Sequence, residues 1–245
     1  MPESLLDLAG ATVVFDLDGT LVDTAPDLVE TLNLLLAEEG LSPLSLAAAR
    51  PMIGQGARAM LAKGFAADGA PLGEPRMSQL FDRFIARYRA HIADHSRPFP
   101  GVVTTLDALA GAGARLAVCT NKRTDLSVAL LRNLGLADRF AAVIGADAAP
   151  AAKPDPRHVV AAIERAGGQA DFAVMVGDSA SDAGAARAAG IPLVLVSFGY
   201  TEIPARDLGP DALIDHFDDL PAACARLLRS CPVSTEPVLG RPPDA

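Results

Sequence analysis

The stretch Val13-Val14-Phe15-Asp16-Leu17-Asp18-Gly19-Thr20-Leu21-Val22-Asp23-Thr24 decides how this chain is expected to fold. Its apolar run begins at Ala11 and is typical of a strand that is buried on both faces of a parallel sheet. The run stops at two carboxylates, Asp16 and Asp18, and a glycine follows them directly. Two like charges at the end of a buried strand are unfavourable unless a cation offsets them. Because carboxylate oxygens suit Mg²⁺, this stretch predicts a magnesium site.

Composition limits the classes of protein to which the chain can belong. Its 245 residues, half of them hydrophobic, suffice for one large domain or for a domain with an insertion. A net charge of −9 argues against nucleic acid or an anionic membrane surface as a partner. The three cysteines lack metal-ligand spacing, which favours a reducing compartment. Without a basic leader or a membrane-spanning apolar run, we expect a cytoplasmic protein, either a monomer or a homodimer.

Two kinds of pattern follow one another along the chain. Residues 24–95 have apolar residues at helical spacing and no strand pattern, and one short helix is expected to begin at Ser42-Pro43. The segment Arg97 to Gly101 is interpreted as a linker. From residue 102 to residue 228, apolar strands alternate with helices, which predicts an α/β fold with a parallel sheet covered on both faces. Residues 230–245 hold four prolines and no periodicity, so we expect a disordered tail there.

Polar residues follow the expected strands at the edge where parallel sheets carry their sites. Thr120 and Asn121 come after one strand, and Asp178 comes after another. Lys153 lies in a loop just before a helix. Each residue has an ordinary explanation by itself, as a turn former, a helix cap or a surface charge. Their common position at one edge, together with Asp16, predicts a single site.

The chemistry of these side chains suggests a role for each in phosphoryl transfer. Asp16 ends the first strand and is the expected nucleophile, which would form an aspartyl-phosphate. Asp18 is the expected acid and base, which would protonate the leaving oxygen and later deprotonate water. Thr120, with backbone N–H groups around Leu17, Asp18 and Asn121, is expected to hold the phosphoryl oxygens. Lys153 would supply a positive charge against them.

The metal ligands are expected among the same carboxylates. Asp16 and Asp178 would bind Mg²⁺ through their side chains, and Asp18 would bind it through its carbonyl oxygen. Asp182 follows closely enough in the sequence to join them as a ligand or as an acceptor behind the ligands. An acid that only stabilises the start of its helix is an equally good interpretation of Asp182.

Together these motifs resemble those of the haloacid dehalogenase (HAD) superfamily phosphatases. The resemblance spans residues 11–228 and implies a Rossmann-like core, residues 1–23 and 96–229, with an all-helical cap inserted at residues 24–95. Within that superfamily, Phe15 to Leu28 is most similar to the phosphoglycolate phosphatases. The implied activity is Mg²⁺-dependent hydrolysis of a phosphate monoester, with 2-phosphoglycolate as the best single substrate. The motifs, in order, are Asp16-Leu17-Asp18-Gly19-Thr20, Thr120-Asn121, Lys153-Pro154, and Gly177-Asp178-Ser179 with Asp182.

Several alternatives stay open at this point. Another sugar-phosphate or nucleotide phosphatase, or a β-phosphoglucomutase, would keep all four motifs. A catalytically silent binding protein on the same fold is disfavoured because none of the motif acids is lost. Haloacid dehalogenases and phosphonoacetaldehyde hydrolases lack the acid that stands here as Asp18.

Substrate choice is expected to depend on the loop Gly54-Gln55-Gly56 and on Arg58, all within the cap. Glycines allow the backbone to approach a ligand closely, and a helix beginning near Ala57 would offer N–H groups to an anion. Arg58 is able to pair with a substrate carboxylate. A solvated helix residue flanked by simple turn glycines is an equally good interpretation.

Overall fold

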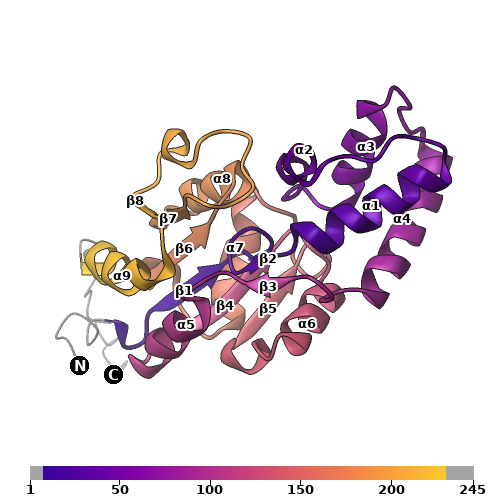
Figure 1. Cartoon of the computed structure of the whole chain (residues 1–245). Coiled ribbons are helices and arrows are strands. Elements are labelled where there is room, and N and C mark those ends of the chain that lie inside the picture. Colours follow the sequence, from indigo (N-terminus) through magenta and orange to yellow (C-terminus); the bar gives the residue numbers. More distant parts are fainter. Residues whose placement is uncertain (1–7, 230–245) are drawn as a thin grey trace, which may run out of the picture.

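A computed structural model describes residues 8–229 of the chain, and its centre is a six-stranded parallel sheet (Figure 1). The strand order is β5-β4-β1-β6-β7-β8. Strand β1 carries the opening motif and lies between two partners, with Val14 opposite Ala117 of β4 and Met175 of β6. The strands are β1 Thr12–Phe15, β4 Arg115–Thr120, β5 Ala142–Gly145, β6 Ala173–Gly177, β7 Leu193–Val196 and β8 Ala212–Ile214.

Helices cover both faces of this sheet. Helices α5 (Val102–Gly111), α6 (Thr124–Asn133) and α9 (Leu220–Arg229) pack on the face that carries Val13 and Phe15. Helices α7 (Pro156–Arg165) and α8 (Ala180–Ala189) pack on the opposite face, which carries Val14. Alternate residues of a strand point to opposite faces, so a strand covered on both sides must be apolar throughout. The predicted α/β, Rossmann-like doubly wound sheet is confirmed.

Four helices gather at one end of the molecule, between strands β2 (Val22–Asp23) and β3 (Arg97–Pro98) (Figure 1). We call these four helices the helical insert. Helices α1, α3 and α4 pack on one another, and each contributes a buried apolar side chain: Leu32, Leu61 and Phe84. The division of the chain into a core domain and a cap domain stays a prediction. The insert consists of α1 Ala25–Glu38, α2 Leu46–Ala49, α3 Ala57–Ala67 and α4 Glu74–Ala90, with a 3-10 turn at Arg50–Met52.

Two local predictions are wrong. The helix expected from Ser42-Pro43 begins only at Leu46. The side chain of Asn33 hydrogen-bonds both the N–H and the C=O of Leu44, at 2.8 Å each, and so prevents helical hydrogen bonding there. Arg97–Pro98, expected to lie in a linker, forms β3 and pairs antiparallel with β2. These strands have two residues each, too few to show an alternating pattern.

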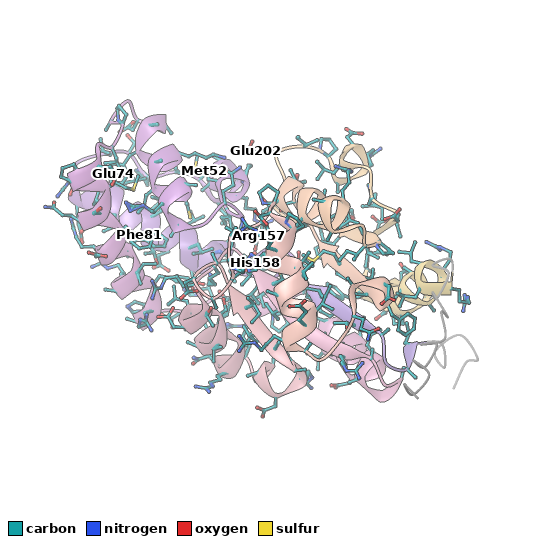
Figure 2. All side chains as sticks on the ribbon, turned by 180° about the vertical axis from the view of Figure 1, so that it is seen from behind. Met52, Glu74, Phe81, Arg157, His158 and Glu202 are labelled. Carbon is teal, nitrogen blue, oxygen red and sulfur yellow. The ribbon has the colours of Figure 1, made fainter. Side chains whose placement is uncertain are left out.

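The insert contacts the core through polar pairs. Arg50 lies 2.9 Å from Asp23, and Lys63 lies 2.6 Å from Glu202 on the loop after β7. Figure 2 shows both parts from behind, with Glu202 labelled on the core. Between residues 8 and 229 no helix is both long and apolar enough to cross a membrane. The tail expected at residues 230–245 lies outside the described residues.

Candidate active site

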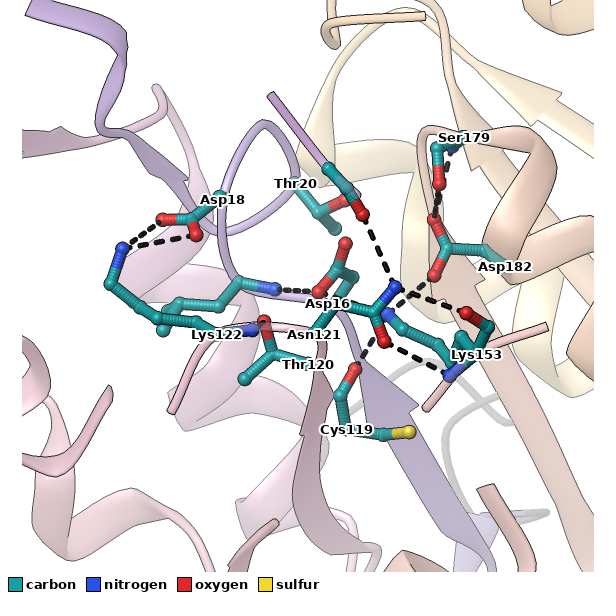
Figure 3. A network of polar contacts seen from close by, with 12 residues as sticks. Asp16, Asp18, Thr20, Cys119, Thr120, Asn121, Lys122, Lys153, Ser179 and Asp182 are labelled. Atoms are coloured by element: carbon teal, nitrogen blue, oxygen red, sulfur yellow. Dashed lines mark hydrogen bonds and ion pairs between the residues drawn. The ribbon is translucent and has the colours of Figure 1, made fainter. Parts of the chain in front are cut away.

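Asp16 follows β1 and lies between two lysine–carboxylate pairs (Figure 3). Its Oδ1 accepts a hydrogen bond from the Leu17 N–H at 2.7 Å and lies 3.0 Å from Lys153 Nζ. No residue that the structure describes hydrogen-bonds its Oδ2. Burial raises the pKa of Asp16 to about 6, against the opposing effect of the Lys153 charge. Asp16 therefore keeps one carboxylate oxygen available for reaction.

The ammonium group of Lys153 is buried among three acceptors. It lies 2.6 Å from Asp182 Oδ1, 2.7 Å from the carbonyl oxygen of Cys119 and 3.0 Å from Asp16 Oδ1. A lysine has three N–H donors, so these contacts use all of them. Burial alone would lower the pKa of Lys153, but the charges of Asp16 and Asp182 outweigh burial and raise it. Lys153 therefore stays charged and fixes both carboxylates.

Three buried carboxylates form a cluster that fits a metal ion. Asp16, Asp178 and Asp182 each offer an oxygen atom, and these atoms lie within 4.8 Å of one another. Burial and the charges of Asp182 and Asp16 raise the pKa of Asp178 well above its usual range. With Lys153 as the single ammonium among them, negative charge remains in excess. A divalent cation would offset this charge, and a donor set of oxygen alone suits Mg²⁺.

Asp182 also has a structural part. Its Oδ2 accepts hydrogen bonds from the Ser179 hydroxyl at 2.7 Å and the Ser179 N–H at 3.0 Å, which completes a capping box at the start of α8. Its Oδ1 is bound to Lys153. Asp182 already contacts a cation, the Lys153 ammonium, whereas Asp178 has no ion pair among the described residues, so the geometry favours Asp182 as an acceptor behind the metal ligands. The helix-stabilising interpretation of Asp182 is also realised in the structure.

Asp178 is fixed by two donors. The Thr20 hydroxyl donates to Oδ1 at 3.0 Å, and the Tyr200 N–H donates to Oδ2 at 2.6 Å. Gly19 adopts a φ of +85°, and a Cβ at this position would lie 2.6 Å from Asp178 Oδ2. The turn after Asp18 therefore requires glycine, both for its backbone conformation and for the close approach of Asp178.

Asp18 points away from the carboxylate cluster (Figure 3). Each of its carboxylate oxygens lies 3.0 Å from Lys122 Nζ, and Oδ1 also accepts a hydrogen bond from Thr24 at 2.7 Å. Burial alone would lower the pKa of Lys122, but the Asp18 charge and the interaction with Tyr88 together outweigh burial and raise it. This geometry leaves the carbonyl oxygen of Asp18, and not its side chain, for the predicted role at the metal.

Sequence reasoning gave Lys122 and Tyr88 no role. Lys122 Nζ lies 4.4 Å from the centre of the Tyr88 ring, so the Lys122 ammonium contacts both Asp18 and Tyr88. The one signal in the sequence was the position of Lys122 directly after Thr120 and Asn121. Tyr88 shares a helix face with Phe84 and reads as an ordinary core residue.

Thr120 and Asn121 come at the end of β4, as predicted from the sequence. Thr120 Oγ1 accepts a hydrogen bond from the Lys122 N–H at 3.3 Å. The Asn121 amide donates to the carbonyl oxygens of Gly54 at 3.2 Å and Lys153 at 3.1 Å, and it accepts from the Lys153 N–H at 2.9 Å. The Asn121 side chain therefore links the Lys153 loop to the insert.

A cavity of about 340 Å³ lies between the sheet edge and the insert. Both Asp16 and the predicted cap loop, Gly54 to Gly56, line it. Arg58 borders this cavity, but its guanidinium binds Glu74 at 3.1 Å and Ser78 at 3.4 Å and lies over the ring of Phe81. Figure 2 labels Glu74 and Phe81 on the insert. The lining includes Asp16, Asp18, Thr120, Asn121 and Lys122 from the core, and Gly54, Gln55, Gly56, Arg58, Phe84 and Tyr88 from the insert.

Residues 13–196 match the family described as haloacid dehalogenase-like hydrolase. The chain belongs to this family. The match covers the opening motif, the insert and the strands up to β7. The membership that the four motifs suggested is confirmed.

Within the haloacid dehalogenase-like hydrolases, the chain is similar to proteins named phosphoglycolate phosphatase, which also confirms the narrower resemblance. It is 60% identical to one from Caulobacter vibrioides over 229 residues, 94% of this chain and 97% of that protein. It is 49% identical to one from Agrobacterium fabrum over 210 residues, 86% and 90% of the two chains. The crystal structure of a predicted phosphoglycolate phosphatase from Haemophilus somnus has a TM-score of 0.80 at 31% identity, and the match covers 86% of this chain and 96% of that chain.

Proposed function

We propose that this protein hydrolyses 2-phosphoglycolate to glycolate and phosphate, with Mg²⁺ as cofactor and an aspartyl-phosphate on Asp16 as intermediate. The reaction type is supported by one observation above all. Asp16 presents a carboxylate to a cavity that it shares with a second carboxylate, Asp18. The substrate is supported by 60% identity to the Caulobacter protein named phosphoglycolate phosphatase.

In the first half-reaction, Asp16 Oδ2 attacks phosphorus and the bond from phosphorus to the ester oxygen breaks. Asp18 gives its proton to that oxygen, so glycolate leaves as an alcohol. In the second half-reaction, the Asp18 carboxylate takes a proton from a water molecule that attacks the aspartyl-phosphate. Phosphate is released and the Asp16 carboxylate is restored. Thr120 and backbone N–H groups at the ends of β1 and β4 hold the phosphoryl oxygens.

The other charged residues orient the nucleophile, bind the metal ion and hold Lys153 in place. Lys153 keeps Asp16 oriented through the 3.0 Å contact to Oδ1, which leaves Oδ2 for the attack. Asp16, Asp178 and the carbonyl of Asp18 would hold Mg²⁺. When bound, the ion would offset the negative charge of the phosphoryl group. Asp182 holds Lys153 and the start of α8 in place.

Phosphate release from a panel of monoesters tests this proposal. The panel contains 2-phosphoglycolate, a hexose 6-phosphate, a nucleoside monophosphate and β-glucose 1-phosphate, each with Mg²⁺ or with EDTA. We expect the highest kcat/KM for 2-phosphoglycolate, only with Mg²⁺, and no turnover by Asp16→Asn. A higher kcat/KM for a hexose phosphate or a nucleotide would show that the substrate is wrong. Conversion of β-glucose 1-phosphate to glucose 6-phosphate would indicate a mutase, and no reaction with any ester would favour a binding protein.

A further inference from the structure

Lys122 differs from the other cationic side chains in the lining of the cavity. Its side chain is 5% exposed, whereas those of Arg58 and Arg123 are each 45% exposed. All three are ion-paired, Arg58 with Glu74, Arg123 with Asp125 and Lys122 with Asp18, so burial is what distinguishes Lys122. An ion contact is strongest where water is excluded, so a direct contact between an anion and Lys122 would be stronger than one with either arginine.

Lys122 keeps donor capacity for such an anion. Its ammonium group has three N–H donors, and the contacts to the two oxygens of Asp18 use two of them. The ring of Tyr88 lies on the adjacent side of the ammonium, 4.4 Å away. The third N–H therefore makes no hydrogen bond of ordinary length to a described residue, and only the longer-range interaction with Tyr88 engages it.

The hydroxyl group of Tyr88 is the second, independent observation. Tyr88 is 1% exposed and borders the cavity, yet no residue among 8–229 lies within ordinary hydrogen-bond geometry of its hydroxyl, and only the Lys122 ammonium interacts with it, at longer range. A buried polar group without a partner costs stability, so an unused hydroxyl at this place calls for an explanation. Burial raises the pKa of Tyr88 to about 12, so the group keeps its proton and remains a donor.

The position of Asp18 indicates that Lys122 and Tyr88 lie near the leaving group. Asp18 must lie within hydrogen-bond reach of the ester oxygen to protonate it. In 2-phosphoglycolate the carboxylate is attached to the carbon that carries this oxygen. The Lys122 ammonium lies 3.0 Å from Asp18, and so it lies beside the group that must reach the ester oxygen.

We propose that Lys122 and Tyr88 form the subsite that recognises the carboxylate of the leaving group. Lys122 supplies one N–H and the opposite charge, and Tyr88 supplies one O–H, so each carboxylate oxygen receives a donor. The assignment rests on the proposed function, and it gives the direct contact with the carboxylate to this pair and not to Arg58. Because Tyr88 lies on α4 and Lys122 follows β4, the core and the insert each contribute half of the subsite.

The test compares 2-phosphoglycolate with ethyl phosphate, which keeps the ester and both carbons but lacks the carboxylate. The readout is the ratio of the two kcat/KM values. Tyr88→Phe and Lys122→Met should each lower this ratio roughly 10- to 100-fold, the loss expected for a hydrogen bond to a charged group. The loss should fall mainly on KM for 2-phosphoglycolate. Lys122→Arg, which keeps the charge, should retain more of the ratio than Lys122→Met.

Controls separate the outcomes. Arg58→Ala is the matched variant, and a larger fall of the ratio there than in Tyr88→Phe and Lys122→Met would overturn the assignment in favour of the cap loop. Equal losses for both esters would show that Lys122 and Tyr88 act only through Asp18, and would also overturn it. Melting curves verify that each variant is folded; Tyr88→Phe should fold at least as well as the unmodified protein because it removes an unpaired hydroxyl.

The proposed function and the subsite can fail separately. Competition by 2-phosphoglycolate against p-nitrophenyl phosphate hydrolysis measures binding without requiring its turnover. Competition that weakens in Tyr88→Phe and Lys122→Met supports the subsite, even if 2-phosphoglycolate is not hydrolysed and the proposed function is wrong. Competition by 2-phosphoglycolate that is equally strong in all variants overturns the subsite while leaving the proposed function intact. An unmodified protein that neither hydrolyses nor binds 2-phosphoglycolate contradicts both.

Discussion

Lys153 Nζ lies 3.0 Å from Asp16 Oδ1 and 2.6 Å from Asp182 Oδ1, so a single buried ammonium joins the end of β1 to the start of α8. Asp16 is the proposed nucleophile, and Asp182 caps the helix that follows Asp178. The contact therefore couples the orientation of the nucleophile to the position of a proposed metal ligand. Loss of this one charge should affect both stability and catalysis.

We expect Lys153→Met to lower the free energy of unfolding by about 3–5 kcal/mol, because it leaves two buried carboxylates without their cation. Urea denaturation in EDTA measures this loss without compensation by a metal ion. Asp182→Asn in the Lys153→Met background removes one of the two charges and should restore part of the stability. A Lys153→Met protein as stable as the unmodified one would show that the cluster is not held by this charge.

Removing the hydroxyl group of Tyr200 and removing that of Tyr88 should have different effects on the free energy of unfolding. The Tyr200 hydroxyl accepts a hydrogen bond from the Ala25 N–H at 3.1 Å and contacts Asp23, at the place where the chain enters the insert. Tyr200→Phe leaves that buried N–H without its partner and should lower the free energy of unfolding by about 1–3 kcal/mol. Tyr88→Phe removes a hydroxyl without a partner among the described residues and should leave stability unchanged or higher. Equal losses in the two variants would contradict this difference.

Much of the fold and of the site could be predicted from the sequence. Val13, Val14 and Phe15 read as a doubly buried strand, and the polar residues after β1, β4 and β6 read as one site because parallel strands place their carboxyl ends together. Contacts between distant side chains could not be predicted. Nothing in the local pattern indicates that Asn33 binds the backbone of Leu44.

The Lys122–Tyr88 contact is another contact between distant side chains that the sequence does not indicate. Helical spacing explains why Tyr88 faces inward, but it does not indicate that a lysine following β4 will lie over its ring. Sequence spacing likewise cannot distinguish the two interpretations of Asp182, since a capping acid and an acceptor behind a metal site both require a carboxylate at this position.

His158 should remain neutral at pH values well below the usual pKa of a histidine side chain. Its Nε2 lies 3.2 Å from the Ile144 carbonyl oxygen, and burial together with the Lys153 charge lowers its pKa to about 4. The unfolded chain takes up this proton near pH 6.5. The neutral ring therefore contributes its full stabilisation above about pH 6.5, and this contribution is lost as the pH falls toward 4. NMR titration of the imidazole should give a midpoint near 4; a midpoint near 6.5 would contradict the buried neutral ring.

Asp178→Asn should have opposite effects with and without magnesium. In EDTA, the substitution removes a buried charge that Asp182 and Asp16 repel, so the melting temperature should rise. With Mg²⁺, the variant loses a proposed ligand, so half-maximal activity should require at least about ten times more Mg²⁺. Glu202→Gln, a change on an exposed loop residue, is the control and should leave the Mg²⁺ requirement unchanged. Full activity of the unmodified protein in EDTA would contradict the proposed metal site.

The covalent step on Asp16 is the central claim, and trapping the intermediate tests it most directly. Asp18→Asn removes the base that activates water, while p-nitrophenolate leaves without needing a proton, so the phosphorylated enzyme should accumulate with p-nitrophenyl phosphate. Rapid acid quench and mass spectrometry should place one phosphoryl group on the peptide that contains Asp16, and hydroxylamine should release it. The same experiment with Asp16→Asn added to the variant should yield no phosphopeptide. Label on another residue, or rapid turnover by an enzyme with an asparagine at position 16, would contradict the account.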